Sequence, residues 1–324
     1  MDALADVLAT VRLSAVVFLH AEFTAPWCIV AKVGPEDCRP LGVLPAHIIA
    51  YHYVIDGQLY LELADEPPLL LTAGDMVLLP RNDEHRLASS PKLRPVTVDA
   101  LIQVADSPGL AQLHYGGGGA ATHIICGFLG CAVADNPLLA TLPAVLPLGV
   151  SDGLAGSWVE QSFRLAAAEF AADSLGSVTL LNKLAELLFV EAVRRYLATL
   201  PRAQTGWLAG LRDPFVGKSL ALLHSRLAAP WTTEALSREV GLSRSAFAER
   251  FSKLIGQPPM TYLAHWRLQL AAARLRDGGA SLAQIAYAIG YESEAAFNRA
   301  FKREFGLPPA TWRKQYAGVQ APPA

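Results

Sequence analysis

The C-terminal third of the chain contains one pattern twice, as SRSAFAERFSKLIGQPPMTY at residues 243–262 and as SEAAFNRAFKREFGLPPATW at residues 293–312. Two phenylalanines four residues apart, a glycine and a pair of prolines recur at a spacing of 50 residues. Two copies are too few for a solenoid, so the repeat indicates a duplicated supersecondary unit.

A shorter helix is expected before each copy, and the two helices together have the pattern of a helix-turn-helix. The shorter helix begins at Thr232 or Ser281, residue types that cap helix N-termini, and a glycine ends it. Gln284 lies three residues after Ser281, as in a capping box. After a short turn the second helix begins at Ser243 or Ser293. The sequence therefore predicts two helix-turn-helix units.

The second helix of each unit has an apolar side and a free side. Because the paired phenylalanines have to face inward, small, polar and basic residues are left on the outside, as in a helix that enters the major groove. We predict DNA contacts from Arg244, Ser245, Ala248, Glu249 and Arg250 in the first unit, and from Glu294, Ala295, Asn298, Arg299, Lys302 and Arg303 in the second.

A long helix is expected between the two copies, from residue 259 to residue 276, with Gly278 and Gly279 ending it. At 1.5 Å per residue it would be roughly 27 Å long. Successive major grooves on one face of DNA are ~34 Å apart. One chain could therefore contact two neighbouring grooves, and a helical bundle that binds no nucleic acid is the alternative.

The two parts of the chain differ in charge. Residues 215–324 hold 14 Lys and Arg against 7 Asp and Glu, a net charge of +7, whereas residues 1–214 have a net charge of −9. A positive segment joined to a negative remainder predicts a polyanionic partner for that segment alone. An uneven distribution of solvated surface charge is the alternative.

The N-terminal part has the pattern of β-structure. Short apolar or alternating runs are separated by turn residues, and these runs lie at 15–23, 27–33, 48–55, 59–63, 76–79, 96–104 and 123–128. Many short strands with such breaks indicate a sandwich or a small barrel.

From about residue 154 the hydrophobic period becomes that of helices, which we expect at 157–173 and 177–199. These helices present more apolar surface than a lid on one small barrel needs. We therefore expect residues 157–199, with Leu184 and Leu188, to form a two-fold dimer contact. Packing against the barrel of the same chain is the alternative.

The C-terminal motifs resemble the DNA-binding domain of the AraC/XylS family. The resemblance covers residues 215–316 and rests on WTTEALSREVGLSRSAF at 231–247, YLAHWR at 262–267 and IAYAIGYESEAAFNRAFKREFGLPP at 285–309. It implies that Ser245, Ala248 and Glu249 are base-facing in the first unit. In the second unit it implies the same for Glu294, Ala295 and Arg299.

The N-terminal part resembles the cupin-like sensor domain of one AraC subfamily, through YHY at 51–53, AGDMVLLP at 73–80, HRL at 85–87, GWL at 206–208 and LRDP at 211–214. This resemblance implies a small β-barrel that modulates the DNA-binding half. The expected fold class is α+β. Its parts are a cupin-like β-barrel sensor at 1–150, a helical dimerisation or lid segment at 151–200, a linker at 201–214 and an all-α domain of two helix-turn-helix units at 215–324.

Histidines in the β-region suggest where a signal binds. His52 and His85 lie where the resemblance puts barrel-lining groups, so we expect a small-molecule pocket at His52, His85 and Tyr51. A transition metal held by His47, His52 and His85 is a second hypothesis. It is weakened because His47 and His52 are five residues apart, which places them on opposite faces of a regular strand. Core histidines without a ligand are the third reading.

The four cysteines form neither a disulfide scaffold nor a C-x-x-C motif. Cys126 and Cys131 flank a short apolar segment and are candidates for redox sensing. Buried small apolar side chains are the alternative.

The sequence thus predicts a DNA-binding transcription regulator, not an enzyme, whose barrel senses a small molecule, a metal or a redox signal. The alternatives are a cupin-type metal-dependent enzyme fused to a DNA-binding module, and a regulator with an inert barrel. The expected partners are double-stranded promoter DNA, a small-molecule effector, RNA polymerase and a second copy of the chain. The N-terminus has no signal-peptide pattern, and no stretch offers ~20 uncharged apolar residues, so we expect a cytoplasmic protein without a membrane segment.

Overall fold

The computed structural model describes residues 4, 13–38, 45–64, 66–97, 111–131, 133, 136–149, 161, 165, 176–201 and 206–316. The helix expected at 157–173 lies outside the described residues except at two positions. Residues 98–104 of one expected strand and residues 202–205 of the expected linker also lie outside them.

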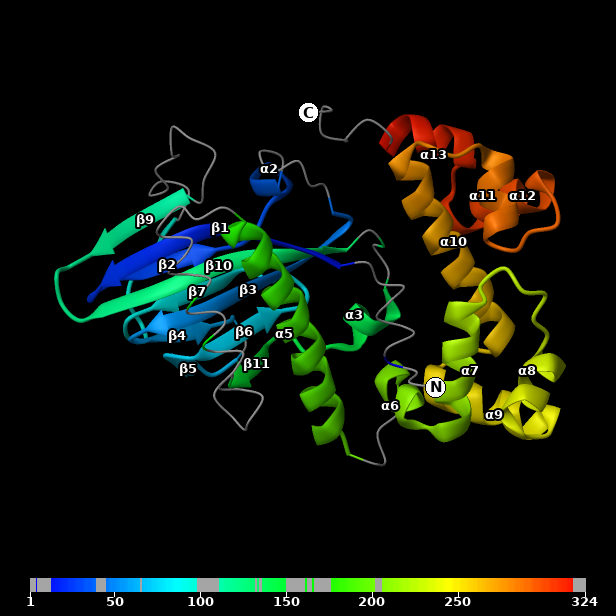
Figure 1. Cartoon of the computed structure of the whole chain (residues 1–324), viewed down its shortest axis with the longest axis horizontal. Coiled ribbons are helices and arrows are strands. Elements are labelled where there is room, and N and C mark those ends of the chain that lie inside the picture. The colour runs from blue at the N-terminus through cyan, green and yellow to red at the C-terminus, as the bar shows by residue number, and fades with distance from the viewer. Residues whose placement is uncertain are drawn as a thin grey trace.

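The N-terminal part, here called the sheet domain, contains two sheets (Figure 1). The first has six strands in the order β11 (Leu146–Gly149), β6 (Asp75–Leu79), β3 (His47–Asp56), β10 (Ala121–Cys131), β1 (Leu13–Thr24) and β9 (Ala111–Gly116). The second has five, in the order β5 (Leu69–Thr72), β4 (Gln58–Glu62), β7 (His85–Ala88), β2 (Cys28–Ala31) and β8 (Val96–Thr97).

The two sheets face each other across a shared core, and the expectation of a closed barrel needs correction. Leu19 and Ile124 of the first sheet pack with Ile29 and Leu61 of the second. No hydrogen-bonded ladder joins the sheets along the strands that the structure describes. The α+β layout itself is confirmed: a sheet-rich N-terminal part precedes a helical C-terminal part.

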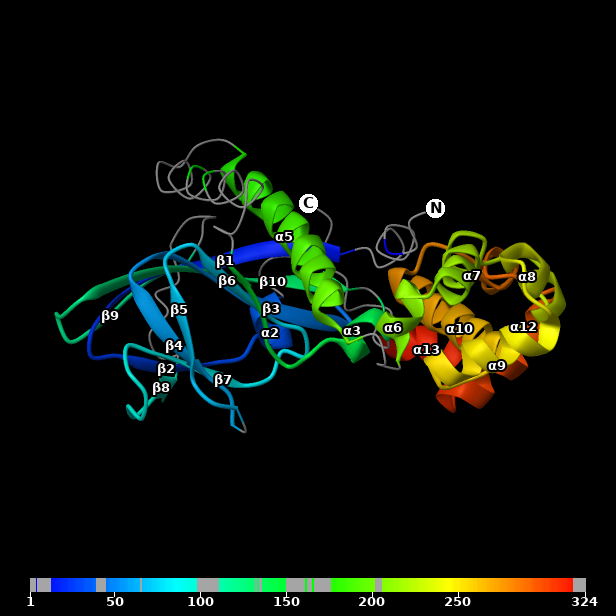
Figure 2. The ribbon, with the colours of Figure 1, turned by 90° about the horizontal axis from the view of Figure 1, so that it is seen from below.

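Strand β3 is buried on both faces, with six consecutive buried residues from Ile49 to Val54. His52 and Val54 face the second sheet, whereas Tyr51 and Tyr53 face the opposite way, because successive side chains of a strand alternate. The second face is covered by helix α5 (Ser177–Thr199), which crosses the sheet against β1 and β11 (Figures 1 and 2).

The expectation that Leu184 and Leu188 of α5 form a dimer contact is wrong. The side chains of Leu184 and Leu188 are 5% and 1% exposed and belong to the core that α5 shares with the sheet. They therefore pack within the chain. Leu180 and Leu187 lie on the other side of the helix and are 40% and 44% exposed.

The expected linker is partly helical. Asp213 alone separates helix α6 (Trp207–Arg212) from helix α7 (Pro214–Ser225). Trp207, Leu208 and Leu211 of α6 are buried. At Gly210 the helix packs closely on Ile255, since a Cβ on this residue would lie 2.5 Å from Cδ1 of Ile255. Residues 206–214 thus belong to the packed structure, because their apolar side chains are buried in the core.

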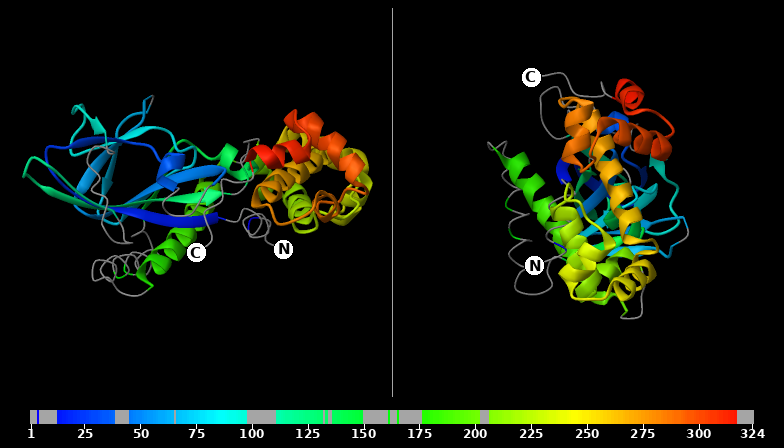
Figure 3. Two further views of the ribbon diagram at one scale, coloured as in Figure 1. Left: turned by 90° about the horizontal axis from the view of Figure 1, so that it is seen from above. Right: turned by 90° about the vertical axis from the view of Figure 1, so that its right-hand side faces the viewer.

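The helical domain contains α6, α7, α8 (Thr233–Val240), α9 (Arg244–Ile255), α10 (Pro259–Asp277), α11 (Leu282–Ala288), α12 (Glu294–Phe305) and α13 (Pro309–Tyr316). Figure 3 shows α10 running through this domain between the two groups of helices. Two shorter helices, α2 (Pro35–Cys38) and α3 (Pro137–Thr141), belong to the sheet domain, and α3 lies beside α6.

The hydrophobic cores divide the molecule in an unexpected place. One continuous core runs from the outer face of β3 through α3, α5 and α6 to Phe247 and Phe251 of the first helix-turn-helix unit and Trp266 of α10. The second unit has a separate core, which includes Ile285, Phe297 and Phe301. Among the described residues, the first unit therefore shares a core with the sheet domain, whereas the second has a core of its own.

Candidate DNA-binding surface and effector pocket

Both predicted helix-turn-helix units are present, with α8 and α9 forming the first and α11 and α12 the second. The expected caps are formed: Ser243 Oγ accepts a hydrogen bond from the N–H of Ala246, and Ser293 Oγ accepts one from Ala296. Ser281 and Gln284 make the reciprocal bonds of a capping box. The second helices α9 and α12 end at Gly256 and Gly306, whose φ values of +83° and +75° suit glycine.

The paired phenylalanines orient both second helices. Phe247 and Phe251 are fully buried with ring centroids 5.7 Å apart, and Phe297 and Phe301 repeat this arrangement at 5.5 Å. Because these rings are anchored inside, the opposite side of each helix faces solvent.

The predicted DNA-contacting residues lie on this free side with graded exposure. Those exposed are Arg244, Ser245, Glu249 and Arg250 on α9, and Ala295, Arg299, Lys302 and Arg303 on α12; Ala248, Glu294 and Asn298 are partly buried. Within residues 206–316, Arg299, Lys302 and Arg303 form no ion pair. Three cationic side chains of the second unit are therefore available to an anionic partner. Their base or phosphate contacts stay a prediction.

Arg250 differs from the other predicted contacts because its guanidinium is already engaged. Its Nε and Nη2 donate to Oδ2 of Asp213 at 2.8 and 2.5 Å, and its carbon Cζ lies 5.2 Å from the centroid of the Phe215 ring. Burial alone would raise the pKa of Asp213, but the hydrogen bonds from Arg250, Val216 and Phe215 lower it below its ordinary value.

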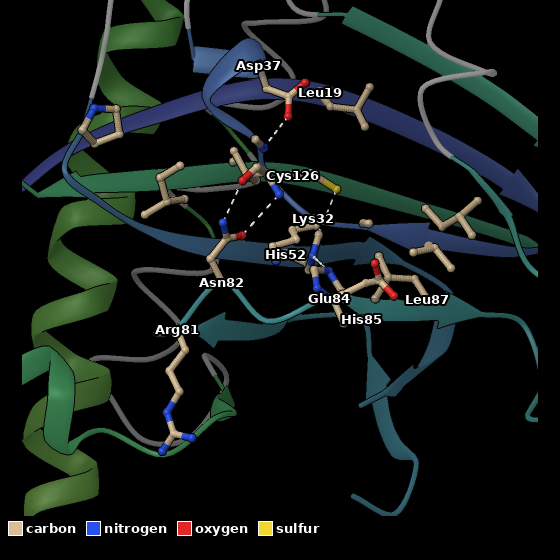
Figure 4. A pocket seen from close by; sticks show the side chains of 18 of the residues that line it. Leu19, Lys32, Asp37, His52, Arg81, Asn82, Glu84, His85, Leu87 and Cys126 are labelled. Carbon is tan, nitrogen blue, oxygen red and sulfur yellow. Dashed lines mark hydrogen bonds between the residues drawn. The ribbon is translucent and has the colours of Figure 1, made fainter. Parts of the chain in front are cut away.

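A cavity of about 660 Å³ lies in the sheet domain between β2, β3, β7 and the segment after β6 (Figure 4). Its apolar lining includes Leu19, Ile29 and Leu87, and Lys32 and Glu84 also line it. His52, His85 and Cys126 form its polar floor. The structure thus brings His52 and His85, the two histidines expected to line a pocket, to the same cavity.

The floor is a single hydrogen-bonded chain. His85 Nδ1 lies 2.9 Å from the carbonyl of Asp83, which only accepts, so this nitrogen donates. Burial lowers the pKa of His85, and burial and the neighbouring His85 lower the pKa of His52, so both rings are neutral. His85 Nε2 therefore accepts from Nε2–H of His52 at 2.7 Å, and His52 Nδ1 accepts from the Cys126 thiol at 3.0 Å. Every ring nitrogen has a partner.

The donor set does not fit the metal hypothesis. His47 is not a member of the chain: its Nε2 lies 2.6 Å from the carbonyl of Pro80 at the end of β6. Both nitrogens of His52 are engaged. In the part of the chain that the structure describes, no group of three or more His, Cys, Asp or Glu side chains is placed to hold a metal ion.

Tyr51 does not line the cavity and needs correction as a pocket residue. It neighbours His52 along β3 and therefore points to the opposite face, where it is buried against the core under α5. The same alternation separates the two cysteines on β10, because Cys126 faces the cavity and Cys131 faces the other core. Burial raises the pKa of both thiols, which keeps them protonated, the less reactive form.

Sequence reasoning missed several residues at these sites. Cys126 was noted only as a thiol, and its pairing with His52 depends on the register of β10 against β3, which sets these two residues opposite each other. Asn82 holds the cavity wall by bonding the backbone of Val33 at both its N–H and its carbonyl. Asp213 lies in the LRDP motif. Its role as the N-cap of α7 could have been predicted, because Asp directly before Pro is a common start of a helix.

Two helix-turn-helix units on one chain, preceded by a sheet domain with an internal cavity, define a DNA-binding transcription regulator with its own N-terminal domain. Comparison with known proteins identifies the family. A family model described as Cupin matches residues 2–198, and one described as Helix-turn-helix domain matches residues 236–315.

The chain is similar to an AraC-like transcription regulator of Streptomyces lividans, with 35% identity over 82% of this chain and 87% of the relative. It is also 26% identical to the HTH-type transcriptional regulator AlkR of Acinetobacter baylyi, over 97% of this chain and all of the relative. Among solved structures, the DNA-binding domain of AdpA in complex with a target DNA is 29% identical over 32% of this chain and 93% of that one, with a TM-score of 0.31. The chain belongs to the AraC family of transcription regulators with a cupin-like N-terminal domain.

None of the described helices combines the length and the apolar character that a bilayer crossing needs.

Proposed function

We propose that this regulator binds a small-molecule effector in the cavity above His52, His85 and Cys126, and that occupancy of the cavity changes promoter binding. The observation that carries the proposal is a cavity of about 660 Å³ with a mainly apolar wall and a polar floor of two buried neutral histidines. Effector pockets are commonly built in this way. A ligand shifts the regulator only through different affinities for its two states.

Filling the cavity tests this proposal. Ala46 lines the cavity and is partly buried, whereas Leu70 is 45% exposed on β5, outside the cavity. We expect some compounds of a metabolite panel to raise the melting temperature of the wild type and of Leu70→Trp, because a ligand that binds only the folded state stabilises it. Ala46→Trp should lose this response and keep basal promoter binding. A compound that stabilises Ala46→Trp as strongly as the wild type would contradict the proposal.

The proposed activity is regulation and not catalysis. The relatives are named as transcription regulators, and the cavity histidines are bonded to each other and to Cys126. We also propose a cytoplasmic location, where promoter DNA is found in bacteria, and RNA polymerase as a partner at the promoter. Redox sensing by Cys126 and Cys131 and an inert sheet domain stay alternatives to the effector.

We propose further that the chain acts as a homodimer through the outer side of α5. Leu180 and Leu187 are two turns apart on this side and are 40% and 44% exposed. Exposed leucines aligned on one helix face are typical of a surface that a second helix covers.

A further inference from the structure

Asp213 lies at the corner between α6 and α7 and uses its side chain in two directions. Oδ1 accepts the N–H groups of Phe215 and Val216, both at 3.0 Å, which caps α7. Oδ2 accepts both donors of Arg250, which is in the middle of α9. The backbone N–H of Asp213 bonds the carbonyls of Ala209 and Gly210, which ends α6. One residue therefore joins three helices.

The repeat shows which way the side chain at position 250 points. Phe247 and Phe251 correspond to Phe297 and Phe301, so Arg250 corresponds to Ala300. Ala300 is only 8% exposed and belongs to the core of the second unit. This position thus lies on the flank of the helix that faces its own domain. The guanidinium of Arg250 turns along that flank to Asp213 and stacks over Phe215, away from the outer residues of α9.

The C-terminal end of α9 has further contacts with α6. The N–H of Gly206 donates to the carbonyl of Leu254 at 2.8 Å, and Gly210 has room for Ile255 only because it lacks a Cβ. Helix α6 also contacts α3 and α5 of the sheet domain. The corner between α6 and α7 consequently connects α9, the second helix of the first unit, with the sheet domain.

We propose that Asp213 is a positioning residue for DNA binding: through Arg250 it holds α9 against the α6–α7 corner, so that Arg250 clamps the helix and does not contact DNA. Removal of either partner releases the same contact. The two substitutions should therefore have the same consequence, and that consequence should be confined to the DNA half-site of the first unit. A direct DNA contact by Arg250 requires a different pattern, in which loss of Asp213 frees the guanidinium and removes a negative charge near DNA.

A double-mutant cycle on the full-length protein distinguishes the two. The probe is a duplex selected from a random pool by the wild-type protein, and footprinting resolves its two half-sites. Arg299→Ala identifies the half-site of the second unit. Asp213→Asn keeps an oxygen for capping α7, and Arg250→Gln removes the charge. We expect each to weaken protection of the first half-site on the order of tenfold. The double variant should be no weaker than the weaker single variant, because one contact is lost in all three.

Two controls keep the result interpretable. Glu234→Gln, like Asp213→Asn, removes one negative charge from the helical domain. The ion pair of Glu234 with Arg238 stays within α8, so this variant should leave both half-sites unchanged. Protection of the second half-site reports whether each variant is folded. The proposal is overturned if Asp213→Asn binds as tightly as the wild type or more tightly while Arg250→Gln loses affinity. It is also overturned if the two losses are independent and add in the double variant.

Discussion

His224 of α7 is buried and shows what a single residue contributes to the helical domain. Its Nε2 is 2.7 Å from the hydroxyl of Tyr262, which also accepts a hydrogen bond from Nε1–H of Trp207 at 2.9 Å. The hydroxyl of Tyr262 thus connects His224 with Trp207, and α6, α7 and α10 are joined by one buried network. Burial lowers the pKa of His224 to about 3.

This pKa predicts how stability depends on pH. An unfolded histidine has a pKa of about 6.5, so between pH 6.5 and pH 3 the unfolded chain binds a proton that the folded chain does not. The contribution of the buried neutral His224 to the free energy of unfolding is complete above pH 6.5. It is lost as the pH falls below that value, by up to about 1.4 kcal/mol per pH unit. His52 and His85 act in the same direction, because burial lowers the pKa of both.

Denaturant unfolding between pH 7.5 and pH 4.5 measures the effect. His224→Gln keeps an acceptor for Tyr262 and cannot titrate, so its free energy of unfolding should fall less steeply with decreasing pH than that of the wild type. Equal slopes for the wild type and His224→Gln would rule out this account.

At the scale of elements, the pattern of the sequence predicted which helices and strands form better than which way they face. The runs at 15–23, 48–55 and 123–128 each lie in a strand, and α9 and α12 begin at the expected serine caps. Strands β5, β7 and β11 have only four residues each, too few to show an alternation that separates them from turns. Helix α5 has apolar residues on more than one side, so periodicity alone could not assign the side that packs on the sheet.

Substitutions on the exposed side and on the buried side of α5 should have different effects on assembly. Replacing Leu180 and Leu187 together by Glu should yield a folded monomer, because both side chains lie on the exposed side. Replacing Leu188 by Glu should instead unfold the sheet domain, because it buries a charge in a core residue that is 1% exposed. Light scattering gives the mass and circular dichroism the fold. A wild-type protein that is monomeric at micromolar concentration would refute the dimer proposal.

At the scale of the whole molecule, the boundary between cores differs from the boundary between domains. The first helix-turn-helix unit shares a core with the sheet domain, through α6, whereas the second unit is packed around its own aromatic cluster. Regions that share a core open together, and regions with separate cores can open alone. If the cavity binds an effector as proposed, this division predicts that its signal reaches α9 before α12. Arg81 lines the cavity and bonds the carbonyl of Leu142 just after α3, the helix that lies against α6.

Native-state hydrogen exchange tests this division. Amides of α9 should share the opening free energy of β3 and β10, whereas amides of α11 and α12 should exchange through a separate opening of lower free energy. Phe297→Leu, in the second core, should lower protection in α11 and α12 and leave α9 nearly unchanged. A single opening free energy for all of these elements would show that the two units are not energetically distinct.

The sequence by itself determined the class of the protein, because helix-turn-helix units are encoded locally. A serine cap, two phenylalanines four apart and a glycine at the helix end specify each unit within about twenty residues, and the second copy repeats them. The pairing of His52 with both His85 and Cys126 was decided by tertiary structure. The register of β10 on β3 sets Cys126, 74 positions away, opposite His52, and the packing of the second sheet on the first brings in His85, 33 positions away. The same is true of the contact of Arg250 with Asp213, 37 residues away, which depends on how α9 packs against the α6–α7 corner. Local patterns encode which elements form, but contacts between distant residues depend on how those elements pack.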